Sequence, residues 1–249
     1  MADGTFISAD EPLRSILTTR HSGTDYVLVG GEGHAVPAGG NSGDSGDRFT
    51  RLAAFSRERL GTCEPAYRWS TQDTLPADGL PLAGPLFPAT AHHSPHLYAI
   101  TGLRKWGLTN GTAAALVVAD AITGADTPWA RLFDSTREIA ASRLPQGQRT
   151  TAAGPAPLPG GPPRPRPGHG TVVEIDGKAV ALYSDHSGEV HALSARCTHL
   201  GCTVEFNGGE STWDCPCHGS RFALDGTVIQ GPAETDLPAR PLPGPFGKD

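Results

Sequence analysis

The sequence lacks long apolar runs, and no segment reaches the ~18 uninterrupted apolar residues that a membrane-spanning helix needs. Its first residues, MADGTFISADEPLR, have neither a basic start nor an apolar core, so we expect no signal peptide. Clusters of lysine or arginine are also missing and the net charge is -6, which argues against a nucleic-acid partner. These absences predict a cytoplasmic protein without a membrane span.

Aromatic residues are scarce, at 6% of the chain, whereas glycine (32) and proline (23) are abundant, which favours turns and loops over a helical bundle. A length of 249 residues allows one large or two modest domains, and we predict two. The composition changes abruptly at residues 144–168 to a proline- and glycine-rich segment, which predicts a linker. The predicted domains are residues 1–143 and 169–242, followed by a tail, residues 243–249.

Cysteine is sparse too, yet four of the five cysteines fall in two short boxes. The first box is CTHLGC, residues 197–202, and the second is CPCHGS, residues 215–220. Each box offers a thiolate and an imidazole, which suits a [2Fe–2S] cluster in which two histidines replace two cysteines on one iron. Tetrahedral zinc is the alternative, although it would leave two of these six residues idle. The fifth cysteine, Cys63, has no basic partner nearby and is predicted to be buried.

The two boxes resemble those of Rieske iron–sulfur domains, of the subtype found in cytochrome bc complexes. The resemblance implies that two thiolates hold one iron and two imidazoles the other. These ligands are Cys197, Cys215, His199 and His218. It also implies a disulfide between Cys202 and Cys217 and a hydrogen bond from Ser220 to a bridging sulfide. Where high-potential members have a tyrosine whose hydroxyl reaches a ligand sulfur, this chain has Phe222, so we expect a potential in the lower half of the Rieske range.

The sequence after the linker predicts short strands separated by glycine turns, among them Asp176-Gly177 and Asp225-Gly226. This pattern favours an all-β antiparallel sandwich. Before the linker, apolar periodicity predicts a helix over residues 47–61, and an alanine-rich run predicts another over residues 112–122. Residues 67–73 and 97–101 are predicted strands.

Two runs before the linker, YRWSTQDTLPADGLPLAG and LYAITGLRKWGLTNGTAAALVVADAI, resemble the C-terminal part of FAD-dependent oxidoreductases of the glycine and D-amino-acid oxidase type. The resemblance is to a subgroup that carries a C-terminal Rieske domain. In that family the loop before the last helix lies beside the flavin ring, where a helix N-terminus stabilises the charge of the reduced flavin. The matching flavin-side positions are Gly102, Lys105, Trp106, Gly107 and Thr109. On the residues alone, tight strand–helix packing explains this segment equally well.

The chain departs from that family at its start, because nothing before Ile16 has the strand and GxGxxG fingerprint that holds the ADP half of FAD. The flavin site is therefore incomplete, and either the chain is shortened or a second polypeptide supplies the missing half. The expected fold is an α+β N-terminal fragment of a flavoenzyme, residues 1–143, followed by the Rieske sandwich.

The leading functional hypothesis is a Rieske protein that passes single electrons to or from a flavin in a fused or partner oxidoreductase. The alternative is a complete FAD-dependent oxidoreductase acting on a small amine or amino-acid substrate, with its FAD domain completed by a partner chain. A ring-hydroxylating dioxygenase component fits less well, because no two-histidine-one-carboxylate set follows the boxes. A remnant whose Rieske module merely folds around its cluster is the non-enzymatic alternative.

Overall fold

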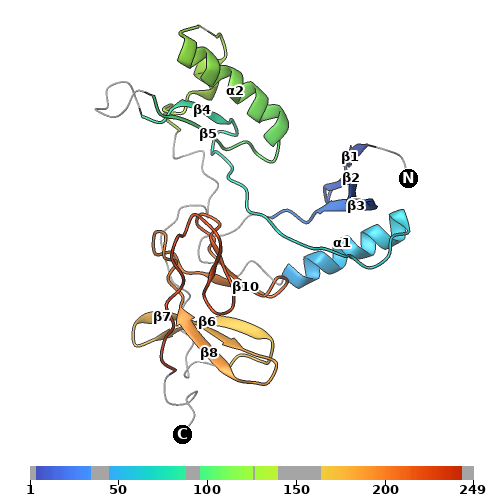
Figure 1. The fold of residues 1–249 in the computed structure, drawn as a ribbon, viewed down its shortest axis with the longest axis vertical. Helices are drawn as coiled ribbons and strands as arrows, with labels where there is room; N and C mark the ends of the chain where they lie inside the picture. The colour runs from blue at the N-terminus through green and yellow to red at the C-terminus, as the bar shows by residue number, and fades with distance from the viewer. Residues whose placement is uncertain (1–3, 35–44, 88–95, 126, 140–163, 243–249) are drawn as a thin grey trace. The chain divides into compact units, whose positions relative to one another are not determined.

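The computed structural model of the chain describes residues 4–34, 45–87, 96–125, 127–139 and 164–242 (Figure 1). It contains two compact units: Met1–Ser70 with Thr150–Asp249, and Thr71–Arg149. Most of the predicted linker, residues 144–168, and the predicted tail, residues 243–249, lie outside the described residues. The segment that ends at Ser70 belongs to the first unit, where Ser70 is hydrogen-bonded to Glu210 and Arg221.

The N-terminal part of the first unit is an antiparallel sheet of order β1-β2-β3 followed by one helix. These elements are β1 (Thr5–Ile7), β2 (Arg14–His21), β3 (Thr24–Gly31) and α1 (Ser45–Leu60). The helix predicted over residues 47–61 is thus confirmed within two residues at its start. Glu32, at the end of β3, forms ion pairs with Arg14 of β2 and with Arg51 of α1, which ties the helix to the sheet.

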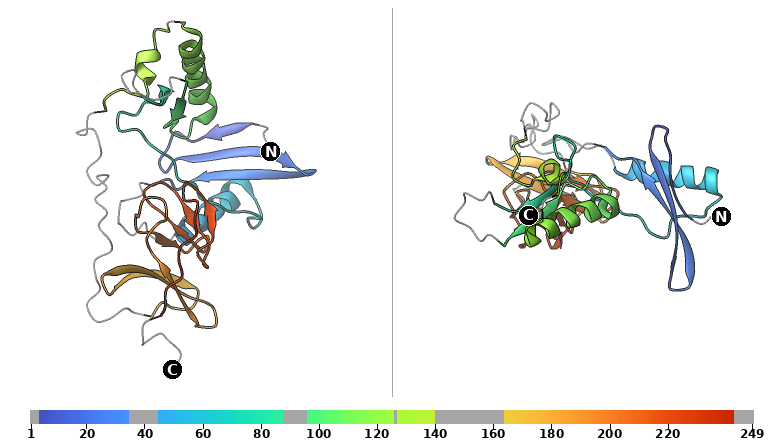
Figure 2. Two further views of the ribbon diagram at one scale, coloured as in Figure 1. Left: turned by 60° about the vertical axis from the view of Figure 1, so that its left-hand side comes forward. Right: turned by 90° about the horizontal axis from the view of Figure 1, so that it is seen from above.

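The C-terminal part of the first unit, residues 164–242, consists of two antiparallel sheets (Figure 2). One sheet has the order β6-β7-β8 and the other β12-β11-β10-β9. Their strands are β6 (His169–Ile175), β7 (Lys178–Ser184), β8 (Val190–Ser194), β9 (Glu205–Asn207), β10 (Thr212–Asp214), β11 (Arg221–Phe222) and β12 (Val228–Gln230). The predicted all-β antiparallel sandwich is confirmed, as is the Asp176-Gly177 hairpin turn, where both residues have positive φ angles.

The core of this sandwich is built on large side chains that are fully buried, including Trp213, Phe222 and Val204. The Phe206 and Trp213 rings meet edge to face, with centroids 5.3 Å apart. A Cβ atom at Gly170 would lie 2.4 Å from the Phe206 ring, so this position of β6 must be glycine for the two rings to pack there. The same core includes Cys197 and Cys215, so the first cysteine of each box is anchored in the packed interior.

The second unit, residues 71–149, has a two-stranded antiparallel sheet and two helices. They are β4 (Leu82–Pro85), β5 (Tyr98–Thr101), α2 (Gly107–Thr123) and α3 (Ala130–Phe133). The predicted strand over residues 97–101 is present, and α2 begins five residues before its predicted start. It ends at Gly124, whose φ of 75° is the left-handed conformation that glycine adopts at helix ends.

Two expectations for the N-terminal half are wrong. Residues 67–73 form no strand, and in their middle the backbone N–H and carbonyl of Ser70 are bonded to the side chains of Glu210 and Arg221 instead of to a neighbouring strand. Cys63 is exposed rather than buried, since it lies in the irregular stretch after α1, outside any core. None of the helices in the described ranges is both long enough and apolar enough to cross a membrane.

Candidate metal centre

The two cysteine boxes fold into loops with the same backbone hydrogen bonds. In each loop the N–H of the first cysteine donates to the carbonyl five residues later, and its carbonyl accepts from the N–H of the glycine four residues later. Gly201 and Gly219 have φ angles of 79° and 80°, a conformation that a residue with a Cβ rarely adopts. In the first box the N–H to carbonyl oxygen distances are 2.8 Å for Cys197 to Cys202 and 2.9 Å for Gly201 to Cys197. In the second box they are 2.7 Å for Cys215 to Ser220 and 3.0 Å for Gly219 to Cys215.

These matched loops bring the predicted ligands together in pairs. Cys197 and Cys215 are 3% and 1% exposed, whereas His199 is half-buried and His218 is exposed. The two imidazole rings face each other edge to face, with centroids 4.9 Å apart and planes at 89°. The site therefore has a buried sulfur side and a histidine side that reaches the surface.

The His199 side chain fits a metal-binding role. Its Nδ1 atom is buried and has no hydrogen-bond partner among the described residues. A buried polar atom without a partner costs about 1–3 kcal/mol, so such atoms mark strained or ligand-binding positions. A metal ion bound at this nitrogen would remove that cost, and the donor set of two thiols and two imidazoles is the one that suits a [2Fe–2S] cluster with mixed ligands.

The Cys215 thiol also fits a metal site. Burial raises its pKa to about 11, and the neighbouring Cys197 thiol acts in the same direction. Without a cation, two thiolates at this depth would be buried charges without compensation, which is unfavourable. A bound metal supplies the positive charge that stabilises both thiolates.

The other two cysteines of the boxes, Cys202 and Cys217, form a disulfide, as the resemblance implied. The sulfur atoms of Cys202, Cys215 and Cys217 lie within 4.8 Å of one another. Since two of these three sulfurs are bonded to each other, they are not available as thiolate ligands, and only Cys197 and Cys215 remain as thiols in the boxes.

We expect the Cys202→Ser/Cys217→Ser double variant to keep its iron but to lose about 3 kcal/mol of unfolding free energy, the loop-closure contribution of a bridge between residues 15 apart in sequence. Denaturant unfolding of the wild-type and double-variant proteins, with iron analysis of both, measures this. Complete loss of iron in the double variant would show that these sulfurs are ligands after all.

A third loop, at Gly231-Pro232-Ala233, closes over the second box. The Ala233 N–H donates to Ser220 Oγ at 3.0 Å, and Ser220 is fully buried. Because this oxygen already accepts a hydrogen bond, its own proton is free to point elsewhere. The Thr198 hydroxyl donates to the Thr235 carbonyl at 2.5 Å, so the same third loop is also tied to the first box.

Comparison with known proteins identifies the family of the C-terminal region. A sequence model of the family described as Rieske [2Fe-2S] domain matches residues 164–241. These residues form a Rieske [2Fe-2S] domain. The iron–sulfur subunit of the cytochrome b6-f complex of Synechococcus sp. (strain JA-3-3Ab) is 49% identical over 70 residues, which are 28% of this chain and 36% of that protein. The crystal structure of the plasma membrane Rieske protein PetC3 from Synechocystis PCC 6803 is 35% identical, with a TM-score of 0.27, and covers 28% of this chain and 72% of that one.

One relative extends beyond the Rieske domain. YhfW of Bacillus subtilis (strain 168), named as a Rieske 2Fe-2S iron-sulfur protein, is 30% identical over 243 residues. The match covers 93% of this chain but 46% of that protein, so the chain spans about half the length of this relative. The region before the Rieske domain therefore has a counterpart in a longer chain. The relatives and structures described above give no evidence for an oxidase-type FAD domain in this region.

The five predicted flavin-side positions lie together in the second unit, around the start of α2. Gly107 is the first residue of the helix, and no side chain in the described part of the structure caps it at Trp106. Gly102 has a φ of 68° and its Cβ would lie 2.4 Å from Pro76, so packing alone explains this glycine. Lys105 also has a positive φ, of 65°, and both Lys105 and Thr109 are exposed.

The sequence did not predict a charged cluster centred on Arg221, the residue directly after the second box. Arg221 of β11 contacts Glu210 Oε2 at 2.5 Å and Asp214 Oδ2 at 2.9 Å. It also donates to the Ser70 hydroxyl at 2.8 Å and to the Ser70 carbonyl at 3.2 Å. In return, the Ser70 N–H and hydroxyl donate to the Glu210 carboxylate. No local pattern could have revealed this cluster, because Ser70 and Arg221 are 151 residues apart.

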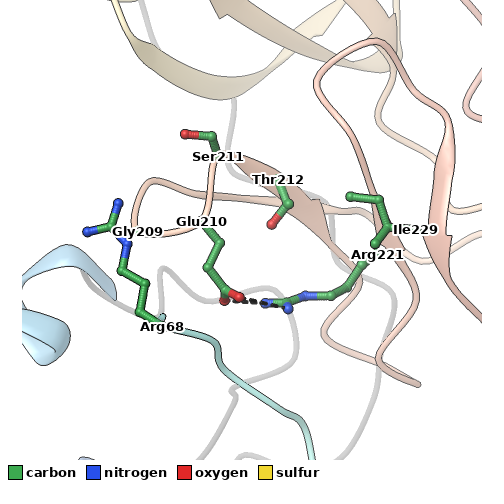
Figure 3. Close-up of a pocket in the computed structure, with 7 residues that line it drawn as sticks. All are labelled: Arg68, Gly209, Glu210, Ser211, Thr212, Arg221 and Ile229. Atoms are coloured by element: carbon green, nitrogen blue, oxygen red, sulfur yellow. Dashed lines mark hydrogen bonds and ion pairs between the residues drawn. The ribbon is translucent and has the colours of Figure 1, made fainter. Parts of the chain in front are cut away.

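Glu210 and Arg221 of this cluster line a cavity of about 300 Å³, as does Arg68 (Figure 3). In Figure 3 the Arg221 guanidinium meets the Glu210 carboxylate, and Arg68 turns away from both. Burial alone would raise the pKa of Glu210, but hydrogen bonds from Arg221 and Ser70 outweigh it and hold the pKa below its usual value. Burial likewise lowers the pKa of the Arg221 guanidinium. The carboxylates of Glu210 and Asp214 outweigh this effect, so the pKa of Arg221 is raised. The charges of this cluster thus stabilise one another.

Proposed function

We propose that this chain is an electron-transfer protein whose [2Fe–2S] cluster is held by Cys197 and Cys215 on one iron and by His199 and His218 on the other. The observation that carries the proposal is the buried, unpartnered Nδ1 of His199 in a loop that matches the second box bond for bond. When bound, such a cluster takes up and releases one electron at a time.

The residues of the chain prepare this site in three ways. The packed core fixes Cys197 and Cys215 and excludes water from the sulfur side. The third loop holds the Ser220 oxygen as an acceptor, which leaves the hydroxyl proton free for a bridging sulfide. The exposed His218 provides the side from which a redox partner reaches the centre.

Anaerobic purification followed by metal and sulfide analysis tests the proposal. Iron and acid-labile sulfide are expected in equal amounts, with the low average g value in the reduced EPR spectrum that histidine ligation produces. Zinc in place of iron, without sulfide, would contradict it.

We expect a midpoint potential in the lower half of the ~-150 to +300 mV range of Rieske centres. Phe222 is fully buried in the same core as Cys197 and Cys215, and it cannot donate a hydrogen bond to a ligand sulfur. In Phe222→Tyr, a new hydrogen bond worth about 1 kcal/mol more in the reduced state raises the potential by roughly 40 mV. Protein-film voltammetry measures the shift. Phe206→Tyr, in the same domain, is the matched control, and an equal shift in both variants would contradict this cause.

We also propose that the redox partner is a flavin, in the same protein or in a partner chain. Support comes from the resemblance of residues 97–122 to flavin-dependent oxidoreductases. In addition, α2 has no acidic residue in its first turn, so no carboxylate of that turn neutralises the partial positive charge at the helix N-terminus. Purification with added FAD followed by desalting separates the alternatives. Cluster signals without flavin favour the electron carrier, and one FAD per chain favours a complete FAD-dependent oxidoreductase.

A further inference from the structure

The outer face of α2 has the composition of a buried surface, although it is exposed. It comprises residues at helical spacing that are all solvent-exposed: Leu108, Thr112, Ala115, Leu116, Ala119 and Ile122. Leu108 is 91% exposed, Leu116 56% and Ile122 62%. The opposite face is already used, since Ala114 and Val117 are buried against β4. A helix that is apolar on all sides is normally enclosed by protein, whereas a surface helix carries charges outward.

The unit that carries α2 is small for a free-standing fold. Its buried core comprises Ala83, Ala114 and Val117, and its sheet has two strands. A two-stranded sheet is marginally stable alone and needs further strands or helices packed on it. Apolar side chains are exposed on its other elements as well, with Ile100 of β5 at 42% and Leu132 of α3 at 56%. The unit thus has apolar surface available for a further packing partner.

The charge pattern of α2 restricts what covers its outer face. Asp120 is the one charged residue in the helix, and it is not on the outer face. Helices that lie on membranes are typically rich in lysine and arginine on their polar side, and nucleic-acid surfaces need basic residues as well. A protein surface that is itself apolar and uncharged fits this face, because an unpaired charge buried there would be costly.

The relative from Bacillus subtilis indicates where such a surface comes from. Its match with this chain includes the region of α2, since 93% of this chain is aligned, yet 54% of the relative lies outside the match (100% - 46%). We propose that the outer face of α2 docks a polypeptide that corresponds to this unmatched part, through apolar contacts centred on Leu116. The inference concerns the second unit and does not depend on the cluster of the first.

Mixing the purified full-length chain with a purified polypeptide that comprises the unmatched part of the Bacillus relative tests the proposal. Size-exclusion chromatography with light scattering is expected to show a one-to-one complex. Leu116→Glu should weaken the complex at least tenfold in Kd, and Leu108→Lys should do so independently at the most exposed position of the face. Ile229→Glu, which changes an equally exposed apolar residue of the Rieske domain, is the matched control and should bind as the wild type does.

Three results would overturn the proposal. They are the absence of any complex with the wild-type chain, a complex that Leu116→Glu and Leu108→Lys leave intact, and a wild-type homodimer that these substitutions convert to monomers. Circular dichroism and the EPR signal of the cluster should be unchanged in all variants. If the wild-type protein shows no EPR signal of a cluster and still binds the partner, that result would count against the proposed electron transfer and not against this docking face.

Discussion

Cys215→Ser is expected to reduce the iron and sulfide content of the purified protein to background. Cys215 is 1% exposed and is one of two thiols that remain in the boxes after Cys202 and Cys217 have formed their disulfide. A serine hydroxyl at this depth does not ionise, so one iron would keep a single protein sulfur. His199→Ala should have the same effect, because it removes the buried nitrogen that lacks a partner. Iron, sulfide and visible absorption measured on anaerobically purified protein report the loss.

Matched controls come from the same chain. Cys63→Ser removes an exposed cysteine outside the boxes, and His191→Ala removes an exposed histidine of the Rieske domain that pairs with Asp185. Both should retain the full cluster. Wild-type iron content in Cys215→Ser, or equal losses in the controls, would show that the assignment of ligands is incorrect.

Arg221→Leu is expected to lower the unfolding free energy by about 3 kcal/mol, because it leaves two carboxylates partly buried without their cation. The side chains of Arg221 and Glu210 are 14% and 12% exposed, and that of Asp214 is 27% exposed, so solvent offsets part of the penalty. Arg20→Leu is the control. It breaks an ion pair with Asp25 whose side chains are 71% and 81% exposed, and it should cost about 1 kcal/mol or less.

The same cluster predicts a dependence on pH. The folded pKa of Glu210 is lowered, so its contribution to stability is complete above its unfolded pKa of about 4.3 and is lost as the pH falls through the folded value. In Arg221→Leu this loss should shrink, since the main source of the lowered pKa is gone. Chemical denaturation at a series of pH values measures both effects, and an unchanged acid profile in the variant would contradict the role of Arg221.

A double-mutant cycle between Ser70 and Arg221 tests whether the segment that ends at Ser70 folds together with the Rieske domain. Ser70 makes hydrogen bonds to both members of the Arg221–Glu210 pair. A coupling energy of about 1 kcal/mol or more is expected for residues in one network. Additive effects of Ser70→Ala and Arg221→Leu would show that the segment ending at Ser70 is independent of the sandwich.

The sequence was most informative where the chemistry is local. Each box holds its predicted ligands, its glycine and its disulfide cysteine within six residues, so the local sequence was enough to identify the two loops. The strands of the sandwich were predictable for the same reason, because turns such as Asp176-Gly177 act on their immediate neighbours. The glycine at which α2 ends, Gly124, is a local signal of the same kind.

Features that depend on distant contacts were not predictable. Residues 67–73 alternate like a strand, yet their partners are the side chains of Glu210 and Arg221 rather than a neighbouring strand. The grouping of residues 1–70 with the C-terminal sandwich depends on these contacts, and composition marked instead the proline-rich segment as the boundary. The ligand assignments and the flavin partner stay predictions until metal and flavin are measured.

The Cys202–Cys217 bridge bears on metal selectivity. If it is reduced, Cys202 and Cys217 become free thiols whose sulfurs, with that of Cys215, lie within 4.8 Å of one another, and such a group of thiolates is one that zinc binds readily. Oxidation of Cys202 and Cys217 to the disulfide removes two of these thiols, so the site can no longer bind zinc through four thiolates. The order of events during maturation therefore decides whether the first metal meets free thiols at Cys202 and Cys217 or only the two thiols and two imidazoles that remain once the bridge has formed.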